Sequence, residues 1–316
     1  MCVHSDDCDM ICEDLKVGIL IIDGFDKEFG IKMCDPSFML GVQRVMTTDP
    51  DSGVTYLELT QQGCITDQFE EYKDDMPHAN RQTPMPDKCF LSLYHPDGDK
   101  RETPADEIAK NNKRGYKHIV GTLLWMSRNC LPEISQGLHQ LCKVMAEPYD
   151  EAFNAALHMI SYCYGQRDRG IRFRSDGNWE PLTLYDSSNK GDLGSSKVCA
   201  GHVVMLAGGP VSWQCKQAQH VGASSSHNEY MAAFHAAKES KWVRDLLMEL
   251  DLPMPPNCSA ERPVVMLADN DQATRWTIHG MVTTGNKSVR MNYHWVQECV
   301  LHRQGRFVKT IDSRYS

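Results

Sequence analysis

The order of the segments between residues 181 and 310 limits the possible folds more than any other feature of the sequence. The strand-like run "PLTLYDSS" is followed by two further runs separated by "AGGP", which is a hairpin signal. Residues 222–250 then have the apolar spacing of a long helix, and "RPVVMLADNDQA" contains the next strand. Helical segments and a last strand, "GRFVKTI", follow. This order predicts an α/β domain built on a mixed sheet.

Three carboxylates occupy related places in this predicted domain. Asp186 lies at the end of the first strand, Glu229 in the first turn of the long helix, and Asp269 at the end of the next strand. If the first and fourth strands are neighbours and the helix packs across them, the three acids meet at one edge. Their mutual repulsion favours the binding of Mg²⁺ or Mn²⁺. Two such ions roughly 3.5–4 Å apart can promote phosphodiester hydrolysis.

Each carboxylate also has a structural explanation. Asp186 and Asp269 are of a residue type that often begins turns after strands. Glu229 is favourable near the positive end of a helix that Ser225 or Ser226 caps. These alternatives stay open for each residue alone, and the shared placement of the three favours a catalytic site.

Charge and composition divide the chain into unlike parts. Residues 1–110 contain 10 Lys and Arg against 23 Asp and Glu, whereas residues 111–316 contain 23 against 19. The net charge of −9 therefore comes from the first third, and the remainder is mildly basic. The stretch 73–112, rich in Pro, Asp and Asn, predicts a linker or long loop, and "VGILII" at 17–22 predicts a core strand. Apolar spacing between 113 and 165 predicts three helices.

The cysteines and the N-terminus indicate the compartment. Thirteen cysteines, an odd number without a C-x-x-C pair, favour reduced thiols over a disulfide framework. The N-terminus has no basic segment followed by an apolar one, and no apolar run approaches the length of a membrane span. We therefore expect a cytoplasmic or nuclear protein that is neither secreted nor embedded in a membrane.

Linked motifs across residues 116–310 resemble the end of the polyprotein of copia-type LTR retrotransposons, the pseudovirus class. The ribonuclease H motifs of that family, "SDxDWAGD", "LSSTEAEYIA" and "CDNQSA", correspond here to "YDSSNKGD", "ASSSHNEYMA" and "ADNDQA". Four further segments are similar to family motifs in the same order: "YKHIVGTLLWMSRNCLPEI", "GGPVSWQCKQAQHV", "AAKESKWVRDLLMELDL" and "NYHWVQE". The resemblance implies a ribonuclease H-like domain over residues 176–316, preceded by a helical connection over 113–175.

This resemblance implies a function for the three acids. Asp186, Glu229 and Asp269 would be catalytic, would hold two Mg²⁺ or Mn²⁺ ions, and would serve to hydrolyse the RNA strand of an RNA–DNA hybrid. Asn270 and Gln272 are candidates for contacts with the minor groove of the hybrid, where the 2′-hydroxyl groups lie. Lys216, together with Trp213 and Gln214, is a candidate for contact with a phosphate backbone, although a tryptophan at such a position is more often a core residue.

The resemblance also extends toward the N-terminus. "FGIKMCDPSFMLGVQ" is similar to a reverse-transcriptase segment of the family, and "VHSDDCDMI" resembles its "YVDD" hairpin. Asp6 and Asp7 would then be a remnant of the polymerase metal-binding dyad, with an acidic tail as the alternative. We therefore expect residues 1–112 to be a truncated palm and thumb remnant with a loop or linker. Because the fingers, most of the palm and the third polymerase carboxylate would lie upstream, we expect no polymerase activity.

Several residues depart from the nuclease pattern. Ser188 and Asn189 replace the second Asp and the Trp of the first motif, and Ser288 and Arg290 stand where the family has His and Asp. The family's fourth carboxylate lies in a helix after the last strand, and here Asp312 is the nearest candidate. A site with three carboxylates is expected to hold one metal ion well and the second poorly.

Two other groups of residues have the chemistry of metal ligands. His294, Glu298 and His302 recur at four-residue spacing, which favours a solvated helix face over a metal site because no fourth ligand is indicated. A second group is crowded near the N-terminus at a spacing that matches no common zinc motif: Cys2, His4, Cys8 and Cys12.

Three functions are consistent with the sequence. The first is a metal-dependent ribonuclease that acts on RNA–DNA hybrids. The second is a catalytically dead retroelement fragment that at most binds nucleic acid. The third is a recruited host protein that uses its acidic first third to bind partners. The intact set of three acids favours the first function, and the expected loss of the final helix and the truncated polymerase favour the second.

Overall fold

The structure is a computed structural model of the chain. It describes residues 2–188 apart from short gaps at 5–6, 11, 13, 34, 36, 77–80 and 96, and then 197–218, 225–250, 264–268, 296 and 305–309. Within this part, none of the helices combines the length and the apolar character that are needed to cross a bilayer.

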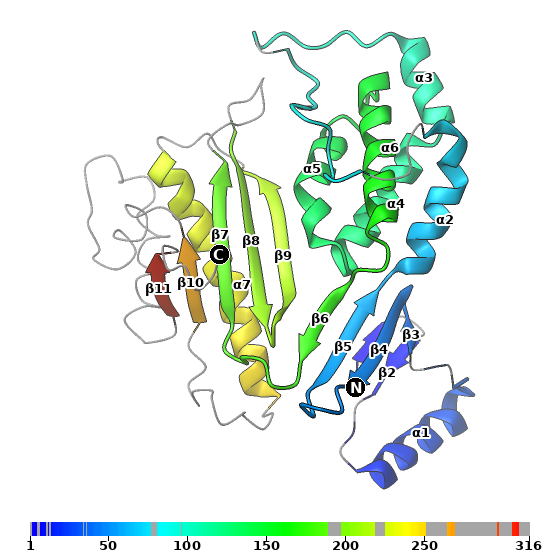
Figure 1. Cartoon of the computed structure of the whole chain (residues 1–316), viewed down its shortest axis with the longest axis vertical. Helices are drawn as coiled ribbons and strands as arrows, with labels where there is room; N and C mark the ends of the chain where they lie inside the picture. The colour runs from blue at the N-terminus through cyan, green and yellow to red at the C-terminus, as the bar shows by residue number, and fades with distance from the viewer. Residues whose placement is uncertain are drawn as a thin grey trace.

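A five-stranded mixed sheet forms the C-terminal part of the chain (Figure 1). Its strand order is β11-β10-β7-β8-β9. The central strand β7 pairs antiparallel with β8 and parallel with β10, and β11 continues the parallel side. The predicted mixed sheet is therefore confirmed, and the first and fourth strands of this part, β7 and β10, are neighbours. The bounds are β7 Leu182–Ser188, β8 Cys199–Leu206, β9 Gly209–Gln217, β10 Val264–Ala268 and β11 Gly305–Lys309.

The hairpin between β8 and β9 has the turn that the "AGGP" segment predicts. Leu206 pairs with Gly209, so Ala207 and Gly208 are the two turn residues. Their φ angles are 51° and 86°. Two successive positive φ angles suit the right-handed twist of the flanking strands, and glycine takes this conformation without steric cost.

One long helix, α7 (Ser225–Glu249), covers one face of this sheet (Figure 1). It lies against β7 and β8. The helix presents a row of small buried side chains, which allows its backbone to approach the strands closely: Ala232, Ala233, Ala236 and Ala237. Tyr230, Tyr185 and Met266 fill the rest of this core. The layer of α7 on the sheet is what fixes the position of Glu229.

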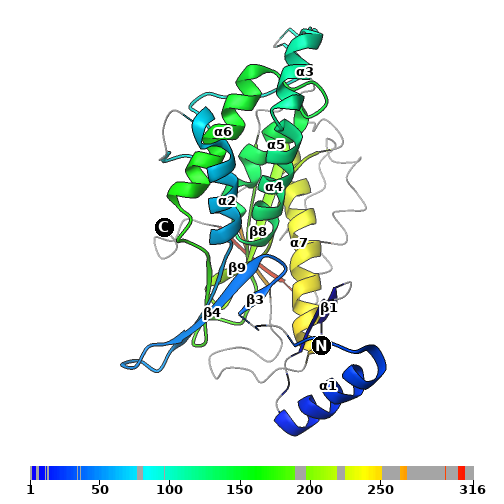
Figure 2. The ribbon, with the colours of Figure 1, turned by 90° about the vertical axis from the view of Figure 1, so that its right-hand side faces the viewer.

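A helical unit precedes the sheet and has its own core. The three helices that the apolar spacing predicts are present as α4 (Tyr116–Asn129), α5 (Ser135–Lys143, after the 3-10 turn η2, Pro132–Ile134) and α6 (Asp150–Gly165). A further helix, α2 (Gln62–Tyr72), packs against α4 and α6. Figure 2 shows α2, α4 and α6 running side by side. Their shared core contains many fully buried side chains, among them Ile65, Ile119, Leu123, Phe153 and Ile160.

A four-stranded sheet connects the two ends of the helical unit. It has the order β3-β4-β5-β6, with every pair antiparallel. Strand β5 precedes the helical unit in the sequence, and β6 follows it directly after α6. The two strands pair, so segments before and after the helical unit share one sheet. The bounds are β3 Phe38–Met39, β4 Val42–Thr48, β5 Thr55–Thr60 and β6 Ile171–Arg174.

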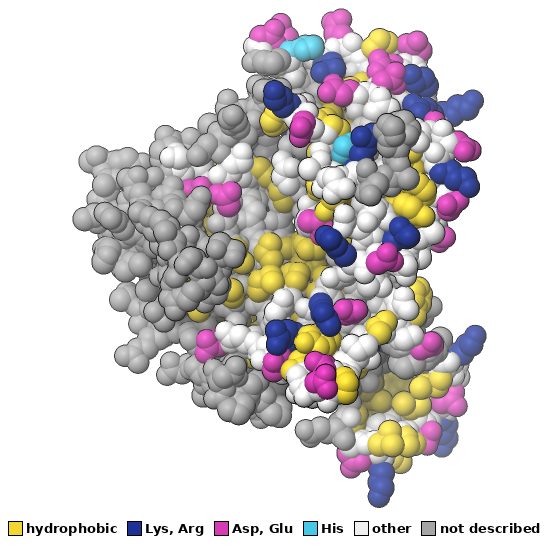
Figure 3. Space-filling model, viewed as in Figure 1, with side chains coloured by type: hydrophobic (Ala, Val, Ile, Leu, Met, Phe, Trp, Pro, Cys, Tyr) yellow, Lys and Arg dark blue, Asp and Glu magenta, His cyan; other side chains and the backbone are white. Residues whose placement is uncertain are grey.

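The N-terminal segment corrects one sequence prediction. The run 17–22, predicted as a core strand, lies in the helix α1 (Leu15–Phe29). The Asp14 side chain caps this helix by accepting from Lys16 N at 2.8 Å, and Gly30 ends it in the left-handed conformation with φ of 64°. Because both signals lie outside the apolar run, the run alone was misleading. Several apolar side chains of α1 are exposed (Figure 3): Leu15, Val17, Ile19, Leu20 and Phe29.

Before α1, the backbone forms a small antiparallel pair of strands, β1 (Cys2–His4) and β2 (Asp7–Asp9). Asp6 lies outside the described residues, as do the side chains of Cys2, His4, Asp7 and Cys8. The polymerase-dyad interpretation and the reverse-transcriptase remnant therefore stay predictions.

The stretch 73–112 is more structured than a linker. It contains the 3-10 turn η1 (Lys73–Asp75) and most of the helix α3 (Ala105–Lys113), which was not predicted. Leu91 is completely buried in the core of the helical unit, and the Tyr149 hydroxyl accepts from Ser92 N at 3.3 Å. The apolar burial of Leu91 holds this segment on the helices. The domain boundaries at 112 and 175 stay predictions.

Packing in the helical unit is testable at adjacent residues of α4. Leu123 is fully buried, whereas Leu124 is 41% exposed. Because Leu123→Ala leaves a cavity, we expect it to lower the free energy of unfolding by about 2–5 kcal/mol. Leu124→Ala is expected to change it by less than about 1 kcal/mol. Urea denaturation followed by circular dichroism measures both, and equal losses would contradict the packing described here.

Candidate active site

Strand β7 presents different side chains to its two faces. Thr183, Tyr185 and Ser187 are buried beneath α7, and the alternate residues Leu184, Asp186 and Ser188 are exposed on the opposite face. Alternation of side chains is a property of every β-strand. The Asp186 carboxylate also accepts a hydrogen bond from the backbone N–H of Ser187 at 2.8 Å. Asp186 is therefore an exposed acid within the strand, two residues before its end.

Glu229 lies in the first turns of α7 and contacts β7. Its side chain is buried, at 4% exposure, and its Oε1 accepts a hydrogen bond from the Ser187 hydroxyl at 2.9 Å. Burying an ionised carboxylate costs free energy unless hydrogen bonds or a cation compensate it. Ser187 supplies one such hydrogen bond and fixes the direction of the carboxylate. The sequence neighbours Asp186 and Ser187 thus bring one acid onto each side of the same strand.

A second hydroxyl pair anchors α7 further along β7. The Ser240 hydroxyl donates to the Ala236 carbonyl at 2.7 Å, and it lies 2.6 Å from the Thr183 hydroxyl. Since a hydroxyl has one hydrogen, Thr183 must donate to Ser240. With Ser187 and Glu229, this pair fixes the helix on the strand at two points, and the register of Glu229 against Asp186 follows.

The strand β10 carries the chain toward the third acid. Leu267 of β10 pairs with Leu184 of β7 in a parallel register. Asp186 follows Leu184 by two residues, and Asp269 follows Leu267 by two residues. Asp269 itself lies outside the described residues, as do Asn270 and Gln272. Within the described part of the chain, no group of three or more His, Cys, Asp or Glu side chains could hold a metal ion.

The remaining metal-ligand candidates also fall outside this part. His294, Glu298 and His302 are not described, nor are Asn189, Ser288, Arg290 and Asp312. The interpretations that rest on them stay predictions.

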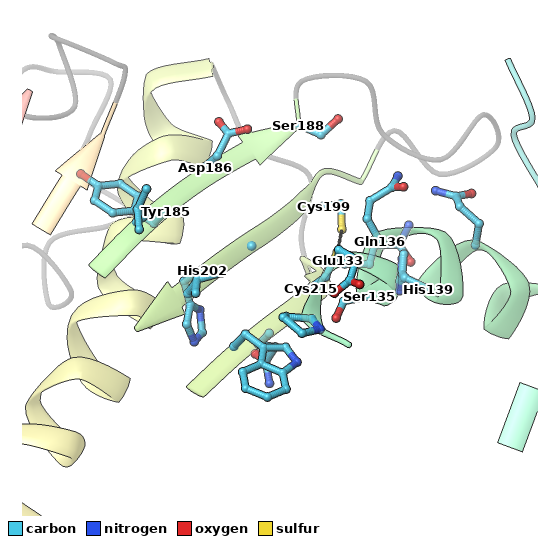
Figure 4. Close-up of a pocket in the computed structure, with 18 of the residues that line it drawn as sticks. Glu133, Ser135, Gln136, His139, Tyr185, Asp186, Ser188, Cys199, His202 and Cys215 are labelled. Atoms are coloured by element: carbon cyan, nitrogen blue, oxygen red, sulfur yellow. Dashed lines mark hydrogen bonds between the residues drawn. The ribbon is translucent and has the colours of Figure 1, made fainter. Parts of the chain in front are cut away.

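A cavity of about 700 Å³ lies on the face of the sheet opposite α7 (Figure 4). Strands β7, β8 and β9 form one wall, and η2 with α5 forms the other. Asp186 and Ser188 line it, together with Glu133 and His139. Burial raises the pKa of the Glu133 carboxyl, which favours its neutral form, so Asp186 faces a cavity of mixed polar and apolar character.

The structure describes Trp213 and Lys216, which are two of the residues proposed to contact nucleic acid. The indole N–H of Trp213 donates to the Ser127 carbonyl of α4 at 2.7 Å, so this group binds within the protein and joins β9 to the helical unit. Lys216 is exposed on β9. The pKa of His235 on α7 is lowered mainly by burial and further by the charges of Lys238 and Lys216. Lys216 therefore lies on the α7 side of the sheet, away from the cavity that Asp186 lines.

Sequence reasoning missed two groups at this site. The first is Ser187, whose role could have been found from the alternation along β7, because every second residue faces the helix. The second is a cysteine pair on the cavity wall, Cys199 and Cys215, which the predicted hairpin register places on one face. Glu133 gave no signal in the sequence, because its burial depends on packing between distant segments.

The strand order, the antiparallel hairpin and the parallel neighbour of β7 define a ribonuclease H-like α/β fold. The chain is similar in sequence to retrovirus-related Pol polyproteins, which confirms the resemblance to copia-type retrotransposons. It is 28% identical over 219 residues to the polyprotein from transposon RE2 of Arabidopsis thaliana, covering 69% of this chain and 14% of that protein. It is 32% identical over 128 residues to the putative transposon Ty5-1 protein YCL074W of Saccharomyces cerevisiae, covering 39% of this chain and 41% of that protein.

Other similarities have lower sequence identity. The secreted RxLR effector protein 161 of Plasmopara viticola is 26% identical over 128 residues, covering 40% of this chain and 90% of that protein. A solved complex of LC11-RNase H1 with an RNA/DNA hybrid aligns at 15% identity with a TM-score of 0.29, over 43% of this chain and 87% of that one. The ribonuclease H1 of Halobacterium salinarum aligns with a TM-score of 0.28, at 13% identity, over 41% of this chain and 86% of that one. No protein-family model matches the chain.

The hydrogen bond between Ser187 and Glu229 is testable through stability. Removal of the donor in Ser187→Ala leaves a buried carboxylate with one hydrogen bond fewer. We expect the free energy of unfolding to fall by about 1–3 kcal/mol at neutral pH. Ser188→Ala, one residue further on the exposed face, is the matched control and should change it by less than about 0.5 kcal/mol. Thermal and urea denaturation measure both, and equal effects would contradict the arrangement on β7.

Proposed function

We propose that the ribonuclease H-like domain hydrolyses the RNA strand of RNA–DNA hybrids in a reaction that depends on Mg²⁺ or Mn²⁺. The observation that carries the proposal is the contact of Glu229 with Ser187, the residue after Asp186. This contact holds one carboxylate at the start of α7 against the central strand, next to the residue that carries a second carboxylate on the other face of that strand. The similarity to retrotransposon polyproteins supports the same function. The chain covers only 14% of the RE2 polyprotein. We therefore also propose that the upstream part of such a polyprotein is a partner of this chain.

The donor atoms suit the proposed ions. Carboxylate oxygens are the protein ligands that Mg²⁺ and Mn²⁺ prefer, and Asp186 and Glu229 would hold them together with Asp269. When bound, two such ions activate a water molecule and stabilise the leaving oxygen of a phosphodiester. Asp186 is accessible from solvent, as a group that meets substrate must be. Ser187 is a positioning residue, because it fixes the Glu229 carboxylate without itself facing the substrate side.

Recognition of the hybrid is proposed to involve further polar residues. Asn270 and Gln272 follow the same strand as Asp269 and are proposed to contact 2′-hydroxyl groups in the minor groove. Lys216 is exposed on β9 and is proposed to contact phosphate. We place the activity in the cytoplasm or nucleus, where such hybrids would be met.

A second candidate function is binding of nucleic acid without cleavage. It is favoured by the alternation along β7, which directs Asp186 and the Glu229-bound Ser187 to opposite faces. In that case Glu229 has a structural role at the interface of α7 with the sheet. Ser188 replaces the second Asp of the first family motif, which is also consistent with binding without cleavage.

Cleavage of an end-labelled RNA–DNA hybrid by the full chain, in Mg²⁺ and separately in Mn²⁺, tests the proposal. We expect cuts in the RNA strand only. Because each acid is a proposed metal ligand, Asp186→Asn, Glu229→Gln and Asp269→Asn should each lower the rate at least about 100-fold. Glu249→Gln, at the exposed C-terminal end of the same helix as Glu229, is the matched control and should retain the rate.

The second function predicts a different result. The folded chain would then retard the hybrid in a gel-shift assay but leave both strands intact in either metal. Cleavage that persists in all three variants would instead point to a contaminating nuclease and would also contradict the proposed site.

A further inference from the structure

Two cysteines face each other across the hairpin of the five-stranded sheet. Cys199 begins β8 and Cys215 lies near the end of β9. Cys215 pairs with Gly201, and Cys199 pairs with Gln217, so the two cysteines are diagonal neighbours on one face of the antiparallel ladder. Their sulfur atoms are 3.2 Å apart. Since Gly201 has no side chain, the space opposite Cys215 is left open to Cys199.

The cysteine pair lines the cavity between the sheet and α5. Figure 4 shows the two sulfur atoms joined by a hydrogen bond on the cavity wall. Both residues are half-buried, and Lys143 of α5 lines the same cavity. The hydrogen bond with Cys215 lowers the pKa of the Cys199 thiol, and the charge of Lys143 lowers it further against the effect of burial. The same contact and burial raise the pKa of Cys215.

These surroundings differ from those of other described cysteines. Burial raises the pKa of Cys130 to about 12 and also raises the pKa of Cys163. Cys64, Cys89 and Cys142 are shifted in the same direction, with burial as the largest cause. Because the thiolate is the reactive form, a lowered thiol pKa beside a second thiol favours oxidation chemistry at Cys199.

We propose that Cys199 and Cys215 form a reversible dithiol–disulfide site that is oxidised by a hydroperoxide entering the cavity. The Cys199 thiolate attacks one peroxide oxygen and becomes a sulfenic acid, and the O–O bond breaks. The departing oxygen takes up the proton that the Cys199 thiol released on ionisation and leaves as an alcohol, or as water when the oxidant is hydrogen peroxide. Cys215 sulfur then attacks the Cys199 sulfur. The sulfenic hydroxyl leaves as water with the Cys215 proton. Two thiols lose two electrons in total, and the peroxide gains them.

The geometry makes the second step an intramolecular one. The sulfur atoms must approach from 3.2 Å to about 2.05 Å, which side-chain rotation with a small strand adjustment can supply. The disulfide would then crosslink β8 to β9 on the cavity wall. Reduction by an external thiol restores both cysteines. The inference does not rest on the proposed nuclease activity, because it concerns sulfur chemistry alone.

Peptide mapping of the full chain tests this site directly. Trypsin cleaves after Lys197 and Lys216, so peptide 198–216 contains Cys199 and Cys215 and no other cysteine. After treatment with an equimolar amount of hydrogen peroxide and alkylation with iodoacetamide, we expect this peptide to lack two hydrogen atoms and to carry no alkyl group. Treatment with dithiothreitol before alkylation should return it to the doubly alkylated form. This measurement uses the chain without any substitution, so its outcome does not depend on whether a variant folds.

Two variants test the order of the steps. With Cys215→Ser, the Cys199 sulfenic acid has no resolving thiol and should be trapped by dimedone. With Cys199→Ser, Cys215 should react with the peroxide more slowly than Cys199 does in the Cys215→Ser chain. The proposal is overturned if the folded chain leaves peptide 198–216 doubly alkylated after oxidation. It is also overturned if Cys130 and Cys163 are oxidised as fast as this pair.

Discussion

The packing of α7 on strand β7 is the interaction on which the rest of the C-terminal domain depends. Four alanines give the helix a flat surface, and the apolar burial that results holds it across β7 and β8. Two polar contacts within this apolar interface then select one register. Thr183 meets Ser240, and Ser187 meets Glu229. A slip of the helix would leave these buried polar groups without their partners, which is costly in an apolar layer.

The same strand has a second face with a different character. On this face, the sheet lies opposite η2 and α5. Asp186 and the cysteine pair line the cavity between the sheet and these helical segments. Trp213 holds β9 to α4 through its indole N–H, so the cavity has walls from both the sheet and the helical unit. The strand β7 thus separates a buried carboxylate, fixed by a serine, from an exposed carboxylate in a solvent-accessible cavity.

The helical unit shows how distant segments become one core. Leu91 comes from a stretch that composition alone would assign to a loop, yet it is completely buried. Strand β6 returns after α6 to pair with β5, more than a hundred residues earlier in the chain. Such pairings depend on the closure of long loops, and no local pattern reports them. The apolar run in α1 shows a different kind of error, in which a local pattern predicts the wrong element. The run alone predicts a strand, whereas the capping residues on either side of it favour a helix.

The sequence by itself determined the periodic elements: the "AGGP" hairpin, the three helices between 113 and 165, and the long helix of Glu229. These follow from local spacing and turn chemistry, which act over a few residues. Only the tertiary structure decided that Ser187 binds Glu229, that Asp186 lines a cavity with Glu133 and His139, and that Cys199 meets Cys215. Each of these depends on which side chains from separate elements share one small volume, and that is set by packing in three dimensions.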